Sequence, residues 1–361
     1  MARDLFGRRR NVELIFVGSG GTNMTRGIYV FHIDCDNGEI IKKKFYKTAP
    51  NPVSFYRKER FLFVTYSNNT GSKQNGGLWQ YASMDLQFGL TANVFNNGKS
   101  YVGSYINDDR SYAYAIDYYN GEIIVVNFLK KKIIKVIQEV KHVGSGPHPR
   151  KQTEAHPAYI EATPDKKRIF VCDLGTDEVV LYRVDDQGLL TRDDENTIHL
   201  TPGSGPRKMI FSPDGQFAYV LNELSSTVCV YRYEDCHFTF VQEISTYPKD
   251  DFSQENAAGD ILVSESGDLL FATNKGYDSV VAFEIDQAIG KLYEVEQVPT
   301  DENPNSLLLF RDKWLVVSTQ VGGTIESFEI KRGERKGVVF ETHFDYMVGE
   351  PLCMIYGRTF D

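Results

Sequence analysis

The chain has few of the residues and patterns that mark several large classes of protein. Among its 361 residues there are only 2 tryptophans and 5 cysteines, and no Cys-x-x-Cys pair occurs. An odd, scattered set of cysteines argues against a disulfide framework, and the missing pair argues against a thiolate zinc site. The N-terminal apolar run, residues 12–17, is short and contains Glu13, which fits neither a signal peptide nor a membrane span. We therefore predict a cytoplasmic protein with no membrane partner.

Positive charge is also scarce. Lys and Arg total 40 against 49 Asp and Glu, so the formal net charge is −9. This balance argues against a nucleic-acid partner, although it leaves room for a local basic pocket. The glycine motifs of nucleotide binding, the Gly-x-Ser-x-Gly elbow and the His-Glu-x-x-His zinc motif are all absent. We predict no cofactor and no metal.

Short β-rich segments recur along the whole chain. Each is an apolar strand followed by a polar turn and a second strand that ends in or near an aromatic residue. One anchor residue was chosen in each segment: Val17, Val64, Ala115, Val171, Val220, Ala272 and Val316. Successive anchors are 47, 51, 56, 49, 52 and 44 residues apart. Repeats of about 40–50 residues are typical of β-propeller blades. The sequence predicts an all-β, seven-bladed propeller formed as a single domain over 1–361, with 1–11 as a flexible arm.

The two ends of the chain complement each other. The C-terminal segment Leu352–Tyr356, which follows Pro351, is typical of an innermost strand, whereas the N-terminal segment Val12–Val17 is typical of a second strand. Joining them in one blade closes the ring and removes two exposed sheet edges. The stretch from Thr70 to Arg110 does not reveal its strand layout, although Asn97-Gly98 predicts a hairpin there.

Several motifs at blade spacing resemble one known family. They are Gly144-Ser145-Gly146-Pro147, His156-Pro157, Asp173-Leu174-Gly175-Thr176-Asp177, Gly203-Ser204-Gly205-Pro206-Arg207, Phe211-Ser212-Pro213-Asp214-Gly215 and Asn222-Glu223-Leu224-Ser225-Ser226. Together they resemble the seven-bladed lactonase propellers, which include 6-phosphogluconolactonases and carboxy-cis,cis-muconate cyclases. The resemblance implies a seven-bladed fold and a lactone substrate. The chain departs from the family's His-Pro-His pattern by having Ala158 after His156-Pro157, and Lys275 stands where the family usually has arginine.

The repeat alignment itself brings four polar residues to one face. His156 and Arg207 enter first strands, whereas Glu223 and Lys275 leave second strands. These positions open on the same end of neighbouring blades, near the central channel. We predict that Glu223, His156 and Arg207 are catalytic and that Lys275 binds substrate. The alternative is structural: Glu223 would only tie Arg207 into the sheet.

Three further residues are predicted to contact substrate, namely Arg150, Asn222 and Asn305. Arg150 and its neighbour Lys151 lie in the insertion before His156, and either one could instead coat a solvated loop. Asn305 begins a first strand as Arg207 does, and Asn222 precedes Glu223. Asp173 and Asp177 are predicted to cap turns. A calcium site built from Asp173, Asn222 and Glu223 is a weaker alternative.

Three functions fit these residues. The first is metal-independent hydrolysis of a small anionic sugar lactone, which the resemblance implies is 6-phosphogluconolactone. Glu223 or His156 would act as general base, and Arg207 and Lys275 would bind phosphate or the developing oxyanion. The second is a muconolactone-type cyclisation, and the third is ligand binding or interaction without turnover. We predict a monomer or weak homodimer.

Overall fold

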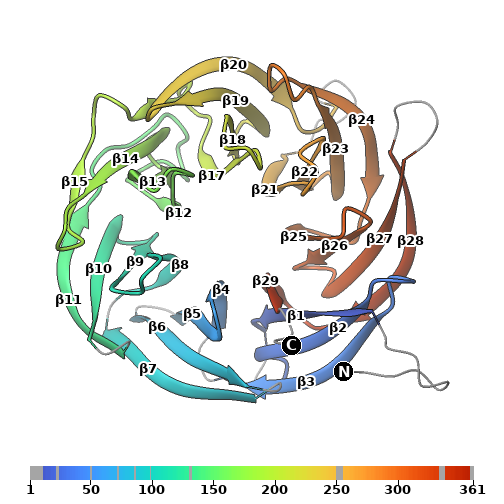
Figure 1. Cartoon of the computed structure of the whole chain (residues 1–361), viewed down its shortest axis with the longest axis horizontal. Helices are drawn as coiled ribbons and strands as arrows, with labels where there is room; N and C mark the ends of the chain where they lie inside the picture. Colours follow the sequence, from blue (N-terminus) through green and yellow to red (C-terminus); the bar gives the residue numbers. More distant parts are fainter. Residues whose placement is uncertain are drawn as a thin grey trace.

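The protein is built from strands arranged around a central axis (Figure 1). A computed structural model describes residues 11–357 except 22–23, 49–50, 71–72, 85–86, 98, 130–131, 249–254 and 333–337. The described part contains 29 strands and no helix. No helix capable of crossing a membrane is therefore found among the described residues. The predicted arm falls almost entirely on residues 1–10, which lie outside the description.

The strands form seven antiparallel sheets, which are the blades of a propeller. Each blade is given from the axis outward. The first three blades are β29 (Pro351–Gly357), β1 (Val12–Ser19), β2 (Gly27–Asp34), β3 (Ile40–Lys47); then β4 (Asn51–Lys58), β5 (Phe61–Thr70), β6 (Lys73–Met84), β7 (Gln87–Asn97); and then β8 (Tyr101–Ile106), β9 (Tyr112–Asp117), β10 (Glu122–Leu129), β11 (Lys132–Lys141). The other four blades are β12 (Pro157–Ala162), β13 (Arg168–Asp173), β14 (Glu178–Val184), β15 (Leu190–Arg192), with β16 (Ile198–His199) also paired to β14; then β17 (Pro206–Phe211), β18 (Phe217–Asn222), β19 (Thr227–Glu234), β20 (His237–Ser245); then β21 (Ala257–Val263), β22 (Leu269–Lys275), β23 (Ser279–Ile285), β24 (Leu292–Pro299); and then β25 (Pro304–Phe310), β26 (Trp314–Thr319), β27 (Thr324–Arg332), β28 (Val338–Met347).

The ring closes as predicted, with the C-terminal strand completing the N-terminal blade. Strand β29 pairs antiparallel with β1, and Ile355 lies opposite Phe16. Packing reinforces this closure, because Trp314 of β26 is only 1% exposed and its indole Nε1 donates a hydrogen bond of 2.9 Å to the Cys35 carbonyl. The last complete blade is thereby joined to the first by side chains, and β29 supplies the backbone ladder.

The structure also settles the stretch that the sequence left open. Strands β4 to β7 form one blade, and β8 begins the next. The predicted hairpin at Asn97-Gly98 is wrong, because β7 and β8 belong to different sheets and do not pair. Here the chain passes from the outer edge of one blade to the inner strand of its neighbour.

Turn chemistry fixes which end of each blade faces which side of the ring. In the blade of β17 and β18, Pro206 lies opposite Asn222 at one end, and Phe211 lies opposite Ala218 at the other. The Ser212–Gly215 turn closes the second end. Its Asp214 carboxylate accepts a hydrogen bond of 3.0 Å from the Gln216 amide, and Gly215 has φ of +73°, a conformation that glycine adopts freely. The end carrying Pro206 therefore lies on the opposite face from these turns, as predicted.

Candidate functional site

The first strand of each blade departs from regular alternation near its start. In β17, Pro206 pairs with Asn222 and Lys208 pairs with Leu221, which leaves Arg207 as an extra residue. The same kind of register shift occurs near the start of β4, β8, β12, β21, β25 and β29. A bulge of this kind re-aims side chains. Two successive residues, Arg207 and Lys208, consequently both line the central channel.

Arg207 and Glu223 form the centre of a charged cluster at the mouth of the channel. Glu223 directly follows β18 and is 8% exposed. An Arg207 terminal nitrogen, Nη1, donates to Glu223 Oε2 at 2.5 Å, and Lys151 Nζ donates to Glu223 Oε1 at 2.8 Å. Burial would raise the pKa of Glu223, but the cations Arg207, Lys275 and Lys151 outweigh it and lower that pKa to about 2. Glu223 is therefore a carboxylate at any physiological pH.

Lys275 brings a third cation to the cluster. It ends β22 on the blade next to Glu223, and its ammonium has no hydrogen bond or ion pair to any described residue. Burial lowers its pKa, repulsion from Arg207 adds to this, and the opposing attraction of Glu223 leaves the pKa at about 7. The ammonium of Lys275 is thus poised between its charged and neutral forms near neutral pH.

Gly259 of β21 makes room for both cations. Arg207 Nε donates to the Gly259 carbonyl at 2.5 Å. A Cβ added to Gly259 would lie 2.5 Å from Thr273 Oγ1, 2.7 Å from the Pro304 carbonyl oxygen and 2.8 Å from Lys275 Cε, closer than real contacts allow. Any larger residue at this position would therefore displace Thr273, Lys275 or the backbone of β25.

His156 lies beside this cluster and is linked to it by Tyr118. The two rings stack with centroids 4.5 Å apart and an interplanar angle of 11°. His156 Nδ1 donates to the Tyr118 carbonyl at 2.9 Å, because a carbonyl oxygen can only accept. The Nε2 atom of a neutral His156 is then the acceptor nitrogen. The charge of Glu223 also acts on Tyr118: burial first and Glu223 second raise the pKa of its phenol to about 12.

The remaining sequence candidates are placed differently. Arg150 does not join the cluster: it forms an exposed ion pair of 3.2 Å with Glu255. The Asn222 amide donates to Thr227 Oγ1 at 3.1 Å inside the blade and is fully buried. Asn305 does line the channel, and its amide donates to the Pro351 carbonyl at 2.9 Å.

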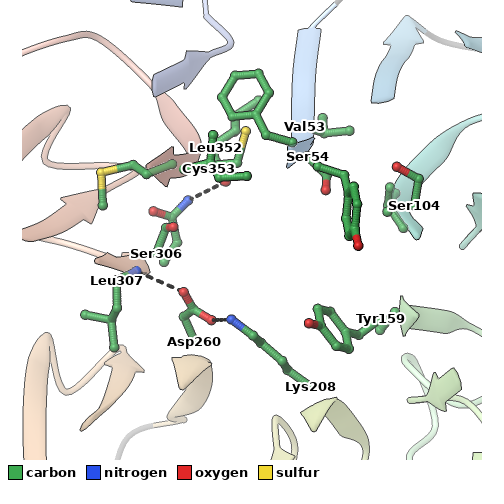
Figure 2. Close-up of a pocket in the computed structure, with 18 of the residues that line it drawn as sticks. Val53, Ser54, Ser104, Tyr159, Lys208, Asp260, Ser306, Leu307, Leu352 and Cys353 are labelled. Carbon is green, nitrogen blue, oxygen red and sulfur yellow. Dashed lines mark hydrogen bonds and ion pairs between the residues drawn. The ribbon is translucent and has the colours of Figure 1, made fainter. Parts of the chain in front are cut away.

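Several channel and mouth residues were missed or undervalued by sequence reasoning. Lys151, weighed as a loop residue, is the one that reaches Glu223, and Tyr118 gave no signal. Lys208 of β17 forms an ion pair of 2.7 Å with Asp260 of β21, which Figure 2 shows spanning part of the channel. The adjacent basic pair at 207–208 was the available signal. In a regular strand, however, neighbouring side chains point to opposite faces, so only the bulge brings both into the channel.

Asp173, one of the residues weighed for calcium, is fully buried and is engaged by other groups. Its Oδ1 accepts from the backbone amides of His156 at 2.8 Å and Gly175 at 2.9 Å, the second being the predicted turn-capping bond. Its Oδ2 lies 2.6 Å from His142 Nδ1. No group of three His, Cys, Asp or Glu residues arranged to hold a metal ion is found in the part of the chain that the structure describes.

The mouth cluster therefore carries three basic side chains and one carboxylate. A second negative charge would complete it, because Lys275 has no counterion among the described residues while Arg207 and Lys151 share Glu223. Arg207 also retains N–H groups beyond the two that its contacts use, and its planar fork suits a carboxylate or phosphate. The geometry is suited to binding a small anion beside His156.

Comparison with known proteins gives a consistent result. A profile of the family described as "Lactonase, 7-bladed beta-propeller" matches residues 14–356. The chain is 28% identical over 345 residues to 6-phosphogluconolactonase of Bacillus subtilis, with 94% of this chain and 97% of that protein covered. It is also 28% identical over 356 residues to YwcC of Lactococcus lactis, with coverage of 95% and 99%. A solved structure of the Pseudomonas aeruginosa periplasmic gluconolactonase PpgL matches with a TM-score of 0.88 at 26% identity, covering 96% of this chain and 99% of that one.

Proposed function

Because the chain belongs to the lactonase family of seven-bladed β-propellers, we propose that it hydrolyses an anionic sugar lactone, with 6-phosphogluconolactone as the first substrate to test. The Bacillus subtilis relative named 6-phosphogluconolactonase supports lactone hydrolysis as the reaction class. The observation that supports an anionic substrate is the ammonium of Lys275, which lies next to Arg207 and Lys151 and has no ion pair to a described residue. A neutral substrate would leave this excess positive charge uncompensated.

The reaction requires water to attack the lactone carbonyl carbon, followed by cleavage of the ring C–O bond and protonation of the leaving oxygen. In our proposal Arg207 and Lys275 hold the anionic group or the developing oxyanion. His156 Nε2 accepts the proton of the attacking water, since Nδ1 is engaged by the Tyr118 carbonyl, and then returns that proton to the leaving ring oxygen. A carboxylate with a pKa of about 2 is a weak base at neutral pH. Glu223 is therefore assigned to holding Arg207 and Lys151 in place.

The test is the hydrolysis of freshly prepared 6-phosphogluconolactone, measured above its spontaneous rate. We expect Arg207→Ala and His156→Gln each to lower kcat/KM by roughly 10²–10⁴-fold. Lys275→Met is expected to act mainly on KM. Arg311→Ala is the matched control, because Arg311 is an exposed arginine in the β25–β26 turn on the opposite face.

Two results would count against the proposal. Wild-type protein that does not exceed the spontaneous rate would remove the activity itself. Equal activity on the phosphorylated lactone and on neutral gluconolactone, with no loss in Lys275→Met, would remove the anionic substrate while leaving lactone hydrolysis intact. A chelator in parallel assays examines the calcium alternative, since loss of activity there would assign Asp173 and its neighbours a different role.

A further inference from the structure

A continuous chain of hydrogen bonds links three buried side chains to His156. The hydroxyl oxygen of Tyr182, on β14, lies 2.7 Å from His142 Nε2, and His142 Nδ1 lies 2.6 Å from Asp173 Oδ2. The other carboxylate oxygen, Oδ1, accepts a hydrogen bond of 2.8 Å from the backbone amide of His156. Tyr182 is 1% exposed, His142 is 3% exposed and Asp173 is fully buried. The chain of hydrogen bonds is therefore shielded from solvent.

The direction of each hydrogen bond follows from the carboxylate. A carboxylate only accepts, so Nδ1 of His142 carries the proton that it donates to Asp173. Nε2 of the neutral imidazole is then an acceptor, and the hydroxyl of Tyr182 is its donor. Burial raises the pKa of the Tyr182 phenol, which keeps this donor protonated. The three side chains thus satisfy one another in a single arrangement of protons, and a fully satisfied buried network is rigid.

The preceding blade holds its first strand in a similar way but without an imidazole. Asp117 ends β9 as Asp173 ends β13, and its Oδ2 accepts a hydrogen bond of 3.1 Å from the backbone amide of Ser100, just before β8. Its other hydrogen bonds to described residues come from residues 119–120 of its own turn. An aspartate is therefore enough to hold the start of a first strand. The histidine and the tyrosine are added in the blade whose first strand is entered by His156.

Every polar group of His156 except one is engaged. Its backbone amide donates to Asp173, and its carbonyl accepts a hydrogen bond of 3.0 Å from the Leu174 amide. Its Nδ1 donates to the Tyr118 carbonyl at 2.9 Å, and the stacked ring of Tyr118 sets the plane of the imidazole. Nε2 has no partner among the described residues. The position of this free nitrogen depends on where Asp173 holds the backbone of His156.

We propose that His142 and Tyr182 are positioning residues for His156. Acting through Asp173, they fix the backbone from which the imidazole projects, so that Nδ1 stays on the Tyr118 carbonyl and Nε2 stays free to accept a proton. Without the His142 donor, one buried carboxylate oxygen would lose its partner, and rotation of the carboxyl group toward another donor would release the His156 amide. The catalytic consequence rests on the proposed lactone hydrolysis, whereas the effect on the His156 ring does not.

The first test reads the His156 ring directly. Two-bond ¹H–¹⁵N correlation spectra of the full chain, at about pH 8 where an ordinary histidine is neutral, distinguish the two imidazole tautomers. The His156 signal is assigned by its loss in His156→Gln. We expect the wild type to carry the proton on Nδ1. His142→Leu should shift the signal toward a mixture of tautomers, Tyr182→Phe should shift it less, and His142→Asn should restore it, because the asparagine amide can donate to Asp173.

The second test measures hydrolysis of 6-phosphogluconolactone by the same variants. We expect His142→Leu to lower kcat roughly 10–100-fold with KM within about twofold, because a misplaced base slows the reaction while the anion-binding groups stay in place. His142→Asn should recover most of this loss. Tyr233→Phe is the matched control: it removes the hydroxyl of another buried tyrosine, which donates to Asp165 at 3.1 Å in a turn on the opposite face. Its kcat and His156 signal should equal those of the wild type.

The rival interpretation is that the chain of hydrogen bonds only ties two blades together, since His142 follows β11 and its partners belong to the next blade. A lower Tm in His142→Leu, with the His156 signal and kcat of the wild type, would establish that interpretation and overturn the proposal. A wild-type signal from the Nε2-protonated tautomer would also overturn it. If His142→Leu does not fold, Tyr182→Phe decides by the same signal. If the wild type does not hydrolyse the lactone, the proposed function fails and the spectra still decide the positioning role.

Discussion

The protonation of Lys275 should make anion binding at the channel mouth depend on pH. Its pKa of about 7 in the unliganded protein results from burial and from repulsion by Arg207 and Lys151, against attraction by Glu223 and Asp260. An anion such as sulfate binds the charged form, so binding requires an added proton above pH 7. If only the charged form binds, the apparent Kd rises by a factor of 1 + 10^(pH − 7), which gives a roughly tenfold weakening, or about 1.4 kcal/mol, between pH 6 and pH 8.

Sulfate is a suitable probe because its own charge is constant in this range. Titration calorimetry at fixed ionic strength should show the tenfold change for wild type and, in buffers of different ionisation enthalpy, the uptake of about one proton at pH 8. Lys275→Arg keeps its charge throughout and should bind sulfate equally at both pH values. His156→Gln separates any contribution from the neighbouring imidazole. A change below twofold in wild type, or the same tenfold change in Lys275→Arg, would refute the reasoning.

Further predictions concern stability and the shape of the mouth. Glu223→Gln should destabilise the fold by about 3–5 kcal/mol, measured by denaturant unfolding, because it leaves Arg207 and its neighbouring lysines without their counterion. Lys275→Met should raise Tm at pH 7 and lose that advantage toward pH 10. Between about pH 7 and 10.5 the lysine binds more protons in the unfolded chain than in the folded protein. The stability of the wild type therefore rises with pH across this window, and the variant does not share that rise. Gly259→Ala should weaken sulfate binding several-fold, seen by calorimetry, because the added methyl group would clash with Thr273, the Pro304 carbonyl and Lys275 and so disturb the mouth. Trp314→Ala should cost about 3–5 kcal/mol of unfolding free energy and should not alter sulfate binding in the folded fraction.

Much of the architecture could be predicted because it follows from local chemistry repeated seven times. Apolar strands, Pro-initiated first strands and Pro-Asp turns each constrain one element, and their period determines the ring. The meeting of Arg207, Glu223 and Lys275 at one mouth could also be predicted, since strand direction alone assigns each residue to an end of its blade. The hairpin at Asn97-Gly98 was wrong because a two-residue turn signal contains no information on which strands pair.

The rest of the mouth depends on loop conformation, which periodicity does not report. Gln152 is fully buried, and its side-chain amide donates to the Leu174 carbonyl at 2.8 Å and to the Asp177 carboxylate at 2.7 Å. This anchoring fixes the insertion so that Lys151 reaches Glu223 while Arg150 reaches the surface residue Glu255. Two adjacent basic residues thus have different roles, and only the folded loop distinguishes them.

The incomplete neutralisation of the mouth is itself an argument for ligand binding. A cluster that served only to hold blades together would be more stable with matched charges, because an unpaired buried ammonium costs free energy that no contact returns. Glu223 balances one of the three cations, and burial first and repulsion from Arg207 second lower the pKa of Lys275. The overall acidic chain, at net charge −9, supplies no carboxylate at hydrogen-bonding distance from Lys275 among the described residues. A negative charge brought by a bound ligand would complete the cluster, which is the property expected of the proposed site for an anionic substrate.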